Sequence, residues 1–130
     1  MIVADGSAVV DLLTGTVERR QAIRDELQAR RRVHAPDLLT LEVLSALARA
    51  GRRKAMTAPE QQDVLDAYAS LRIRRHSSHP LWPRIARLTA RHSSYDAAYV
   101  ALAEMLDAPL LTTDVRLARA VTTVEVIHPV

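Results

Sequence analysis

The sequence predicts an α/β fold of three layers, in which a central, mostly parallel sheet of four to five strands lies between helices. Short apolar runs alternate along the chain with longer segments of helical periodicity, which is the order of parallel strands joined by helices. The runs are apolar at consecutive positions, which indicates strands buried on both faces. With 130 residues, 48% of them hydrophobic, the chain suits a single domain over residues 1–130 with one core.

The composition narrows the class of protein. Aromatic residues make up only 3% of the chain and phenylalanine is absent, so the core is expected to be aliphatic. The absence of cysteine excludes disulfides and thiolate metal sites and favours a reducing, cytoplasmic compartment. Neither a membrane span nor a signal peptide is expected. The net charge of +3 and the pI of about 9.9 mildly favour a polyanionic partner, although a bias towards arginine explains them equally well.

The first strand is predicted at residues 2–4, where β-branched residues lead a short apolar run. Asp5 lies at its carboxyl end, and Gly6 then allows a tight turn. Ser7 is predicted to cap a helix that begins at Ala8. The chain therefore starts with a buried strand that presents a carboxylate at the sheet edge where α/β proteins bind ligands.

A charged outer helix is predicted over residues 17–31, after a break at 14–16. Its apolar residues are few and at helical spacing, so most of its surface faces solvent. The arginine run at 30–32 suits a helix C-terminus, with contact to RNA as the alternative. A second buried strand is predicted at 33–35.

The next helix is expected over residues 37–50, opened by Pro36 and ended by Gly51. It is apolar nearly all round, which indicates packing on more than one side. Glu42 lies in the middle of this helix, between Leu41 and Val43 in the sequence. A carboxylate in that setting costs free energy unless a cation or a hydrogen-bond donor accompanies it.

Thr57 and Glu60 predict a capping box at the start of the following helix. Residues 71–76 are predicted to form an edge strand, because their arginines discourage pairing with other chains, and RNA contact is the less favoured alternative. Trp82 is expected to pack between helices. The five histidines form no pattern of zinc ligands.

The last third of the chain repeats the alternation of helix and strand. A long helix is predicted at residues 93–106 and a short apolar strand at 109–112. Asp114 is predicted to cap a helix at 115–120, and the final strand covers 123–127.

Four acidic residues stand out along the chain, three at the ends of these elements and Glu42 within a helix, and each has an ordinary structural explanation. Asp5 suits an Asx-turn, and Asp114 suits an N-cap. Asp96 suits a capping box with Ser93, and Glu42 can extend to solvent from an apolar helix. Taken singly, none of the four identifies a functional site.

Taken together, the four acids predict a metal site. Asp5 and Asp114 follow strands, Asp96 begins a helix and Glu42 lies in the first turns of another, so a parallel fold brings all four to one sheet edge. Converging carboxylates repel one another unless a cation neutralises them. Oxygen ligands without cysteine or clustered histidine select Mg²⁺ or Mn²⁺. Such ions suit phosphodiester hydrolysis.

Four segments carry a family resemblance that covers the whole chain. The sequence resembles PIN-domain ribonucleases, specifically VapC-type toxins of bacterial or archaeal toxin–antitoxin pairs. The matching segments are MIVADGSAVVDLL around Asp5, LLTLEVLSALARAG around Glu42, SSYDAAYVALAEML around Asp96 and PLLTTDVRLARA around Asp114.

The resemblance implies that these four acids bind Mg²⁺ or Mn²⁺ as the catalytic quartet, and that metal-bound water is the nucleophile. It implies RNA as substrate and products with a 5′-phosphate and a 3′-hydroxyl. It also implies a homodimer and inhibition by a VapB-like antitoxin whose arm enters the acidic groove.

The resemblance further implies that Ser7 and Thr112 support the site by hydrogen bonds. Gly6 stands where the family tolerates several small residues.

Two other functions compete with this prediction. A metal-dependent phosphatase or aspartyl-phosphate protein also uses carboxylates at a sheet edge, but the segment after the first strand lacks the close second acid of that class. A non-catalytic α/β binding module, in which the acids are only caps, predicts no metal binding. Calorimetric titration with Mn²⁺ separates this module from both enzymes.

Overall fold

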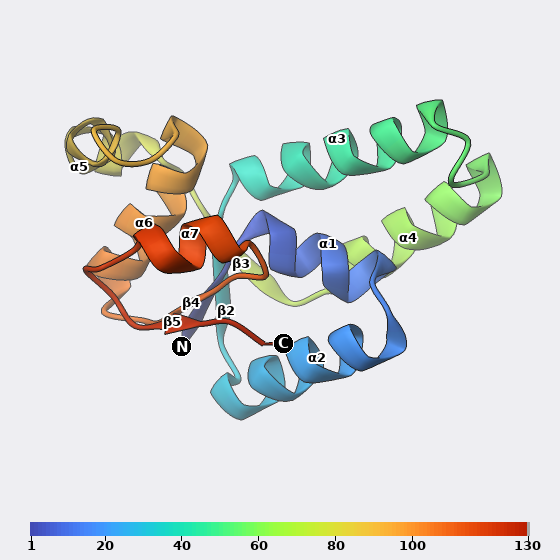
Figure 1. Ribbon diagram of the computed structural model, residues 1–130, viewed down its shortest axis with the longest axis horizontal. Coiled ribbons are helices and arrows are strands. Elements are labelled where there is room, and N and C mark those ends of the chain that lie inside the picture. Colours follow the sequence, from blue (N-terminus) through green and yellow to red (C-terminus); the bar gives the residue numbers. More distant parts are fainter. Residues whose placement is uncertain (130) are drawn as a thin grey trace.

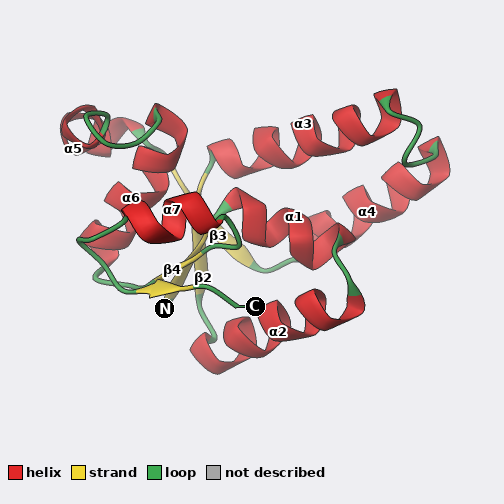
Figure 2. Ribbon diagram, viewed as in Figure 1, coloured by secondary structure: helices red, strands yellow, loops and turns green. Residues whose placement is uncertain are grey.

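A five-stranded parallel sheet forms the centre of the structure, a computed structural model that describes residues 1–129 (Figure 1, Figure 2). The strand order is β3-β2-β1-β4-β5, and every neighbouring pair is parallel. The strands are β1 (Ile2–Ala4), β2 (Val33–Pro36), β3 (Ile73–His76), β4 (Leu110–Leu111) and β5 (Val126–Ile127). The three-layer α/β prediction is confirmed, including the position of β3 at an edge.

Helices cover both faces of this sheet, and the pair α3 and α4 extends beyond it (Figure 1). The helices described are α1 (Gly6–Thr14), α2 (Val17–Arg30), α3 (Leu38–Arg52), α4 (Ala58–Ser70), α5 (Trp82–Leu88), α6 (Ser94–Leu106) and α7 (Val115–Ala120), with a single 3₁₀ turn at His79–Leu81. The predicted capping box of α4 is present. No helix of the described chain is long and apolar enough to cross a membrane.

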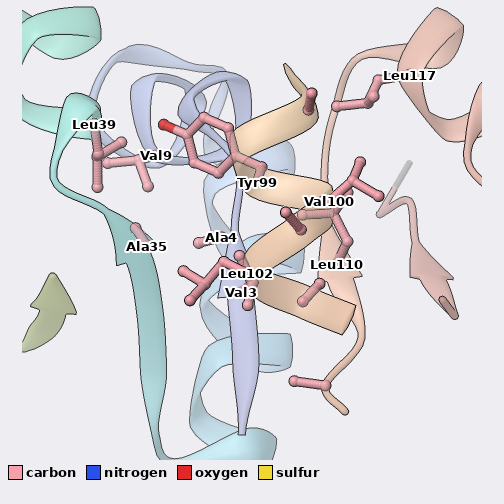
Figure 3. Packing of buried hydrophobic residues seen from close by; sticks show 14 of the residues in the cluster. Val3, Ala4, Val9, Ala35, Leu39, Tyr99, Val100, Leu102, Leu110 and Leu117 are labelled. Atoms are coloured by element: carbon pink, nitrogen blue, oxygen red, sulfur yellow. The ribbon is translucent and has the colours of Figure 1, made fainter. Parts of the chain in front are cut away.

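The core divides at the sheet because successive strand residues point to opposite faces. Val3 of β1 packs in the larger cluster with α6, whereas its neighbour Ile2 packs with α1 and α2. Leu110 and Leu111 of β4 divide in the same way. Figure 3 shows the larger cluster, in which Tyr99 of α6 lies among aliphatic side chains.

The first turn of α1 differs from the prediction. The helix begins at Gly6, so Asp5 stands at the N-cap position and Ser7 lies inside the helix, which makes the prediction of Ser7 as the cap wrong. Gly6 does not have a positive φ, so its place is not explained by a tight turn. The contacts of both side chains with the acidic residues explain them instead, as described below.

Two side-chain predictions were wrong, because apolar side chains that were expected to be buried are exposed. Trp82 was expected between helices but is 60% exposed. Helix α3 was expected to pack on more than one side, yet Leu41 is 67% exposed and only one face, with Leu39 and Val43, is buried. Pro36 ends β2, and α3 continues past Gly51 to Arg52, small shifts at element boundaries.

The order of the strands positions the site. From β1 the chain moves to β2 on one side, whereas β4 lies on the other side of β1. The carboxyl ends of β1 and β4 therefore flank a topological switch point, where open α/β sheets bind ligands. Asp5 and Thr112 directly follow these two strand ends.

Candidate active site

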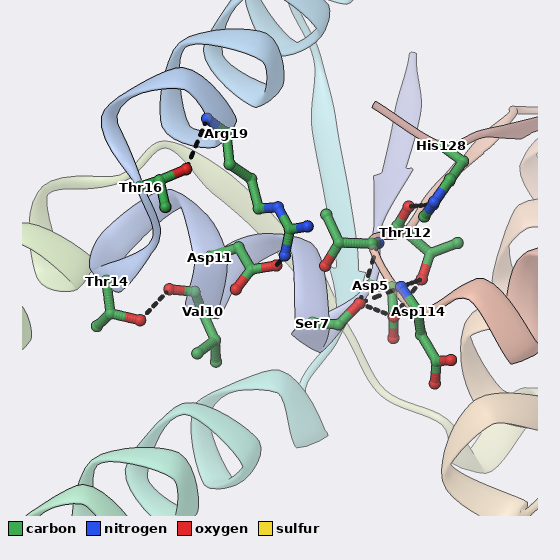
Figure 4. A network of polar contacts seen from close by, with 11 residues as sticks. Asp5, Ser7, Val10, Asp11, Thr14, Thr16, Arg19, Thr112, Asp114 and His128 are labelled. Carbon is green, nitrogen blue, oxygen red and sulfur yellow. Dashed lines mark hydrogen bonds and ion pairs between the residues drawn. The ribbon is translucent and has the colours of Figure 1, made fainter. Parts of the chain in front are cut away.

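Asp5 is the most buried of the four acids, with 5% of its surface exposed. Two hydroxyls donate to its Oδ2 atom, from Ser7 at 2.6 Å and from Thr112 at 2.8 Å (Figure 4). Burial raises the pKa of Asp5, and these two hydrogen bonds partly offset that rise, whereas the charge of Asp96 adds to it. The hydroxyls therefore fix the orientation of a carboxylate that its surroundings disfavour.

Ser7 and Thr112 also tie the two sheet-edge loops together. Their hydroxyl oxygens lie 3.1 Å apart, the Thr113 N–H donates to Ser7 Oγ, and the Asp114 N–H donates to Thr112 Oγ1. This network places the loop after β4 against the first turn of α1. Ser7 thus donates a hydrogen bond to Asp5 although it is not the helix cap, and its support of a catalytic site stays a prediction from the family resemblance.

Glu42 points from α3 to α6, where the Tyr99 hydroxyl donates to its Oε1 atom at 2.5 Å. Burial raises the pKa of Glu42, the bond from Tyr99 offsets part of this rise, and the charges of Asp5 and Asp96 add to it. Tyr99 is fully buried, and burial together with the contact to Glu42 raises the pKa of its hydroxyl. The hydroxyl therefore stays protonated and acts as a donor to the carboxylate.

Tyr99 was not predicted as a site residue. It follows Asp96 by three positions in a helix of alanine, valine and leucine, so both residues lie on one face of α6. A buried tyrosine needs a partner for its hydroxyl, and this isolated polar group in an apolar helix was the available signal.

Gly6 permits the close approach of Glu42 to α1. A Cβ atom at Gly6 would lie 2.7 Å from Glu42 Oε1 and 3.4 Å from the Tyr99 hydroxyl. Any larger residue would therefore push the Glu42 carboxylate away from its present position. This contact explains glycine at a position where the backbone conformation does not require it.

Asp96 occupies the first turn of α6, where its own backbone N–H donates to the capping hydroxyl of Ser93. In the capping box of α4, the Glu60 side chain also accepts from the backbone N–H of the capping residue. The described structure shows no such bond from the Ser93 N–H to the Asp96 side chain in α6. The carboxylate of Asp96 is close enough to Asp5 and Glu42 to raise the pKa of both. Its side chain thus acts on the acidic cluster rather than on the cap.

Asp114 stands beside the cluster with its carboxylate turned to α7. Its Oδ1 atom accepts from the backbone N–H groups of Arg116 at 2.9 Å and Leu117 at 3.4 Å, as the predicted N-cap does. Figure 4 shows its side chain extending away from the hydroxyls of Ser7 and Thr112. The structure therefore groups Asp5, Glu42 and Asp96, and places the fourth carboxylate at their margin.

The acidic cluster of Asp5, Glu42 and Asp96 suits a divalent cation in its donor atoms and in its charge. Its donors are carboxylate and hydroxyl oxygens, and its carboxylates raise one another's pKa, a repulsion that a cation relieves. Across residues 1–129, however, no three acidic or histidine side chains stand close enough to hold one ion as they are arranged. Glu42 is held by Tyr99 and Asp114 by α7, so a coordination shell formed by all four acids would require these two side chains to turn.

The fold and this cluster define a class: a parallel α/β domain with converging acids at its switch point. The sequence profile of the PIN domain matches residues 2–122. The chain is 44% identical over 123 residues to Ribonuclease VapC3 of Mycobacterium tuberculosis, covering 92% of this chain and 86% of the relative. It is 37% identical over 118 residues to VapC ribonuclease Mb0985 of Mycobacterium bovis, covering 91% and 89%.

Solved structures share the fold at low sequence identity. The structure of FitAcB from Neisseria gonorrhoeae matches with a TM-score of 0.73 at 14% identity, covering 99% of this chain and 98% of that one. VapBC2 from Rickettsia felis, bound to a DNA fragment from its promoter, matches with a TM-score of 0.71 at 12% identity, covering 98% of each chain. The chain belongs to the PIN-domain family, among its VapC members.

Proposed function

We propose that this protein is a metal-dependent endoribonuclease and the toxin of a type II toxin–antitoxin pair. The observation that carries the proposal is the group of mutually repelling carboxylates, Asp5, Glu42 and Asp96, at the switch point of a VapC-family chain. The ribonuclease names of the relatives support RNA as the substrate.

In this proposal Asp5, Glu42, Asp96 and Asp114 hold Mg²⁺ or Mn²⁺. A bound ion would supply an activated water for attack on the phosphodiester and would stabilise the leaving oxygen, and such hydrolysis would leave a 5′-phosphate and a 3′-hydroxyl. Ser7 and Thr112 keep Asp5 oriented by donating to Oδ2. Tyr99 favours the ionised form of Glu42 and restricts the movement of its side chain, because a hydrogen-bond donor to a carboxylate favours the charged form.

The proposed partner is an antitoxin chain, and the toxin itself is proposed to be a homodimer. Structural neighbours that are toxin–antitoxin complexes support the first part, among them one from Klebsiella pneumoniae. Carboxylates without a cation attract a guanidinium, which binds them in a bidentate fork, so an arginine of the antitoxin is proposed to enter the cluster.

Besides the acidic cluster, a second surface suits the binding of the rest of the antitoxin chain. A cavity of about 490 Å³ between α1, α2 and α4 has an apolar floor that includes Leu12, Leu27 and Leu71. Arg20 also lines this cavity, and its Nε atom is buried and has no hydrogen-bond partner in the described structure. An amphipathic helix with an acidic residue at its edge fits this combination.

The test is cleavage of RNA in Mg²⁺ or Mn²⁺, in EDTA, and after EDTA with the metal restored. We expect cleavage only with metal, end groups as stated above, and growth arrest on expression that Asp5→Asn abolishes. A second assay titrates Mn²⁺ into the protein by calorimetry. Cleavage that continues in EDTA contradicts the metal mechanism, and the absence of both cleavage and Mn²⁺ binding favours a non-catalytic module.

A further inference from the structure

A groove of about 520 Å³ runs from the acidic cluster along the outer face of α3. Its lining residues are Leu38, Leu41, Glu42, Ser45 and Arg49 of α3 and Tyr95 of α6. The helical spacing of the α3 residues places them in one stripe that faces Tyr95. Glu42 belongs to both the stripe and the cluster, so the groove meets the cluster at Glu42, and Tyr95 in its lining directly precedes Asp96.

Tyr95 gives the groove an aromatic wall. The side chain is 64% exposed and immediately precedes Asp96 in α6. Leu41, also in the lining, is 67% exposed, so the groove has apolar surface on both of its helices. A nucleic-acid base is a flat ring that stacks on such an aromatic face whatever its sequence.

Arg49 gives the same groove a positive charge. It lies seven residues after Glu42, which corresponds to about 10 Å along the helix axis. None of the ion pairs in the described structure involves Arg49, so its guanidinium is available to an external anion. At this distance Arg49 would meet a different phosphate of a bound strand from the one that would lie at the acids.

We propose that this groove is a nucleotide subsite for single-stranded RNA, in which one base stacks on Tyr95 and a flanking phosphate pairs with Arg49. The inference rests on the proposed function, since it takes the acids as the place of cleavage. The competing occupant is a second copy of this chain. Such an interface would have to desolvate Glu42 and Arg49, which costs free energy unless both find partners.

The first test measures binding of a fluorescent single-stranded oligouridylate to protein that carries Asp5→Asn, which keeps the groove and removes a proposed metal ligand. We expect Tyr95→Ala to weaken binding by roughly 5- to 150-fold, the effect of one lost base stack. Tyr95→Phe should retain the binding. The matched control is Trp82→Ala, because Trp82 is 60% exposed and lies outside the groove lining.

The second test measures the salt dependence of the same binding. Loss of one phosphate contact lowers the slope of log K against log salt by about 0.7 for a single strand. We expect that change for Arg49→Gln and no change for Arg53→Gln, an exposed arginine on the same helix end.

The third test measures cleavage by the protein with Asp5 intact. Tyr95→Ala should raise KM with kcat nearly unchanged, because the base contact is the same in the ground and transition states. The Mg²⁺ midpoint of cleavage should stay at the wild-type value, since a displaced Asp96 would move it.

Several results overturn the subsite. The first is oligouridylate binding that is unchanged in Tyr95→Ala, and the second is an equal loss of binding affinity in Tyr95→Ala and Trp82→Ala. The third is a Tyr95→Ala protein that no longer forms a dimer but keeps its RNA affinity per chain. The last result would make the groove a subunit interface. Absence of cleavage by the wild-type protein with intact binding effects would instead contradict the proposed function alone.

Discussion

Glu42 is held by a contact that joins three helices. Its carboxylate receives the Tyr99 hydroxyl from α6 and lies against the backbone of Gly6 in α1. In the proposed metal site, Glu42 must both stay ionised and turn towards the cation, so it needs a donor that holds it without replacing the cation. The buried tyrosine meets that need because its ring is fixed by the core and only its hydroxyl reaches the site.

Tyr99→Phe tests this function of the hydroxyl. The ring remains in the core, so the free energy of unfolding should fall by about 1 kcal/mol, the usual net contribution of one hydrogen bond. Cleavage and Mg²⁺ affinity should fall by roughly 10- to 100-fold, as for other residues that orient a metal ligand. Melting curves and a Mg²⁺ titration of cleavage measure both, and a lower melting temperature with an unchanged Mg²⁺ midpoint would show that Tyr99 is purely structural.

Gly6→Ala tests the same contact from the other side. The added Cβ must displace Glu42, whose flexible side chain can move at small cost, so the fold should persist. Alanine also favours the helix by roughly 1 kcal/mol over glycine, which offsets part of any loss. We expect a protein of nearly unchanged stability with weakened Mg²⁺-dependent cleavage. Full activity in Gly6→Ala would show that the position of Glu42 tolerates a shift.

At the scale of elements, helix α6 carries two kinds of residue at its N-terminus. Ser93 caps the helix through its hydroxyl, so the cap does not depend on the Asp96 side chain. Asp96→Asn therefore loses only a charge–dipole interaction of about 0.3–1 kcal/mol, while the repulsion with Asp5 and Glu42 falls. In EDTA the variant should melt at or above the wild-type temperature and lose the stabilisation by Mg²⁺. A variant that melts lower in EDTA yet still cuts RNA would make Asp96 a cap.

Strands β2 and β3 meet at a pair of buried or half-buried histidines, with His34 Nδ1 and His76 Nε2 2.8 Å apart. Burial lowers the pKa of both, and the charge of Arg74 adds to the effect. Below the ordinary histidine pKa of about 6.5, the unfolded chain binds more protons than the folded protein. The contribution of the pair to the free energy of unfolding should therefore be present above that pH and be lost as pH falls through the lowered pKa.

His76→Gln keeps a hydrogen-bonding side chain and removes one titrating group. Urea unfolding from pH 7.5 down to 5 should therefore show a shallower loss of stability in this variant than in the wild type. Equal slopes in the two proteins would mean that the pair does not control the acid sensitivity of this sheet edge.

The sequence predicted these elements well where a local cause determines them. The capping box of Thr57 and Glu60 and the Asp114 cap depend on neighbours within three positions, and both are present. The contact between Tyr99 and Glu42 joins positions 57 residues apart, which no local pattern encodes. The wrong expectation for Trp82 has a related cause, because periodicity identifies an apolar face without identifying what covers it.

At the scale of the whole molecule, a chain with a net charge of +3 concentrates negative charge at one edge of its sheet. The hydroxyl donors at Asp5 and Glu42 offset part of the cost of this burial and repulsion. In the proposed metal site, a cation that binds the folded state recovers the remaining cost. The dependence of stability on metal and its dependence on pH therefore arise from the same carboxylates.

Removal of metal should therefore lower stability in a way that depends on the acids. Mg²⁺ at about 100 times its dissociation constant adds roughly 2.7 kcal/mol to the free energy of unfolding, and EDTA abolishes it. Asp5→Asn should show little of this difference. A melting temperature of the wild type that is the same in Mg²⁺ and in EDTA would contradict the metal site, whatever the activity.

The pH dependence of the metal-free protein gives the last prediction. The pKa values of Asp5 and Glu42 are raised in the folded state, so the folded protein binds more protons than the unfolded chain between the ordinary and the raised values. Stability from this source is fully present below the ordinary pKa of about 4 and is lost as pH rises through the raised pKa. In EDTA, Asp5→Asn should be more stable than the wild type at pH 7.5, and the difference should shrink as pH falls towards 4. The difference between the unfolding free energies of the two proteins at each pH cancels the opposite contribution of the histidine pair, which is common to both proteins. A difference that grows at low pH would mean that Asp5 is stabilised as a carboxylate in the fold, and that no cation is needed to neutralise the cluster.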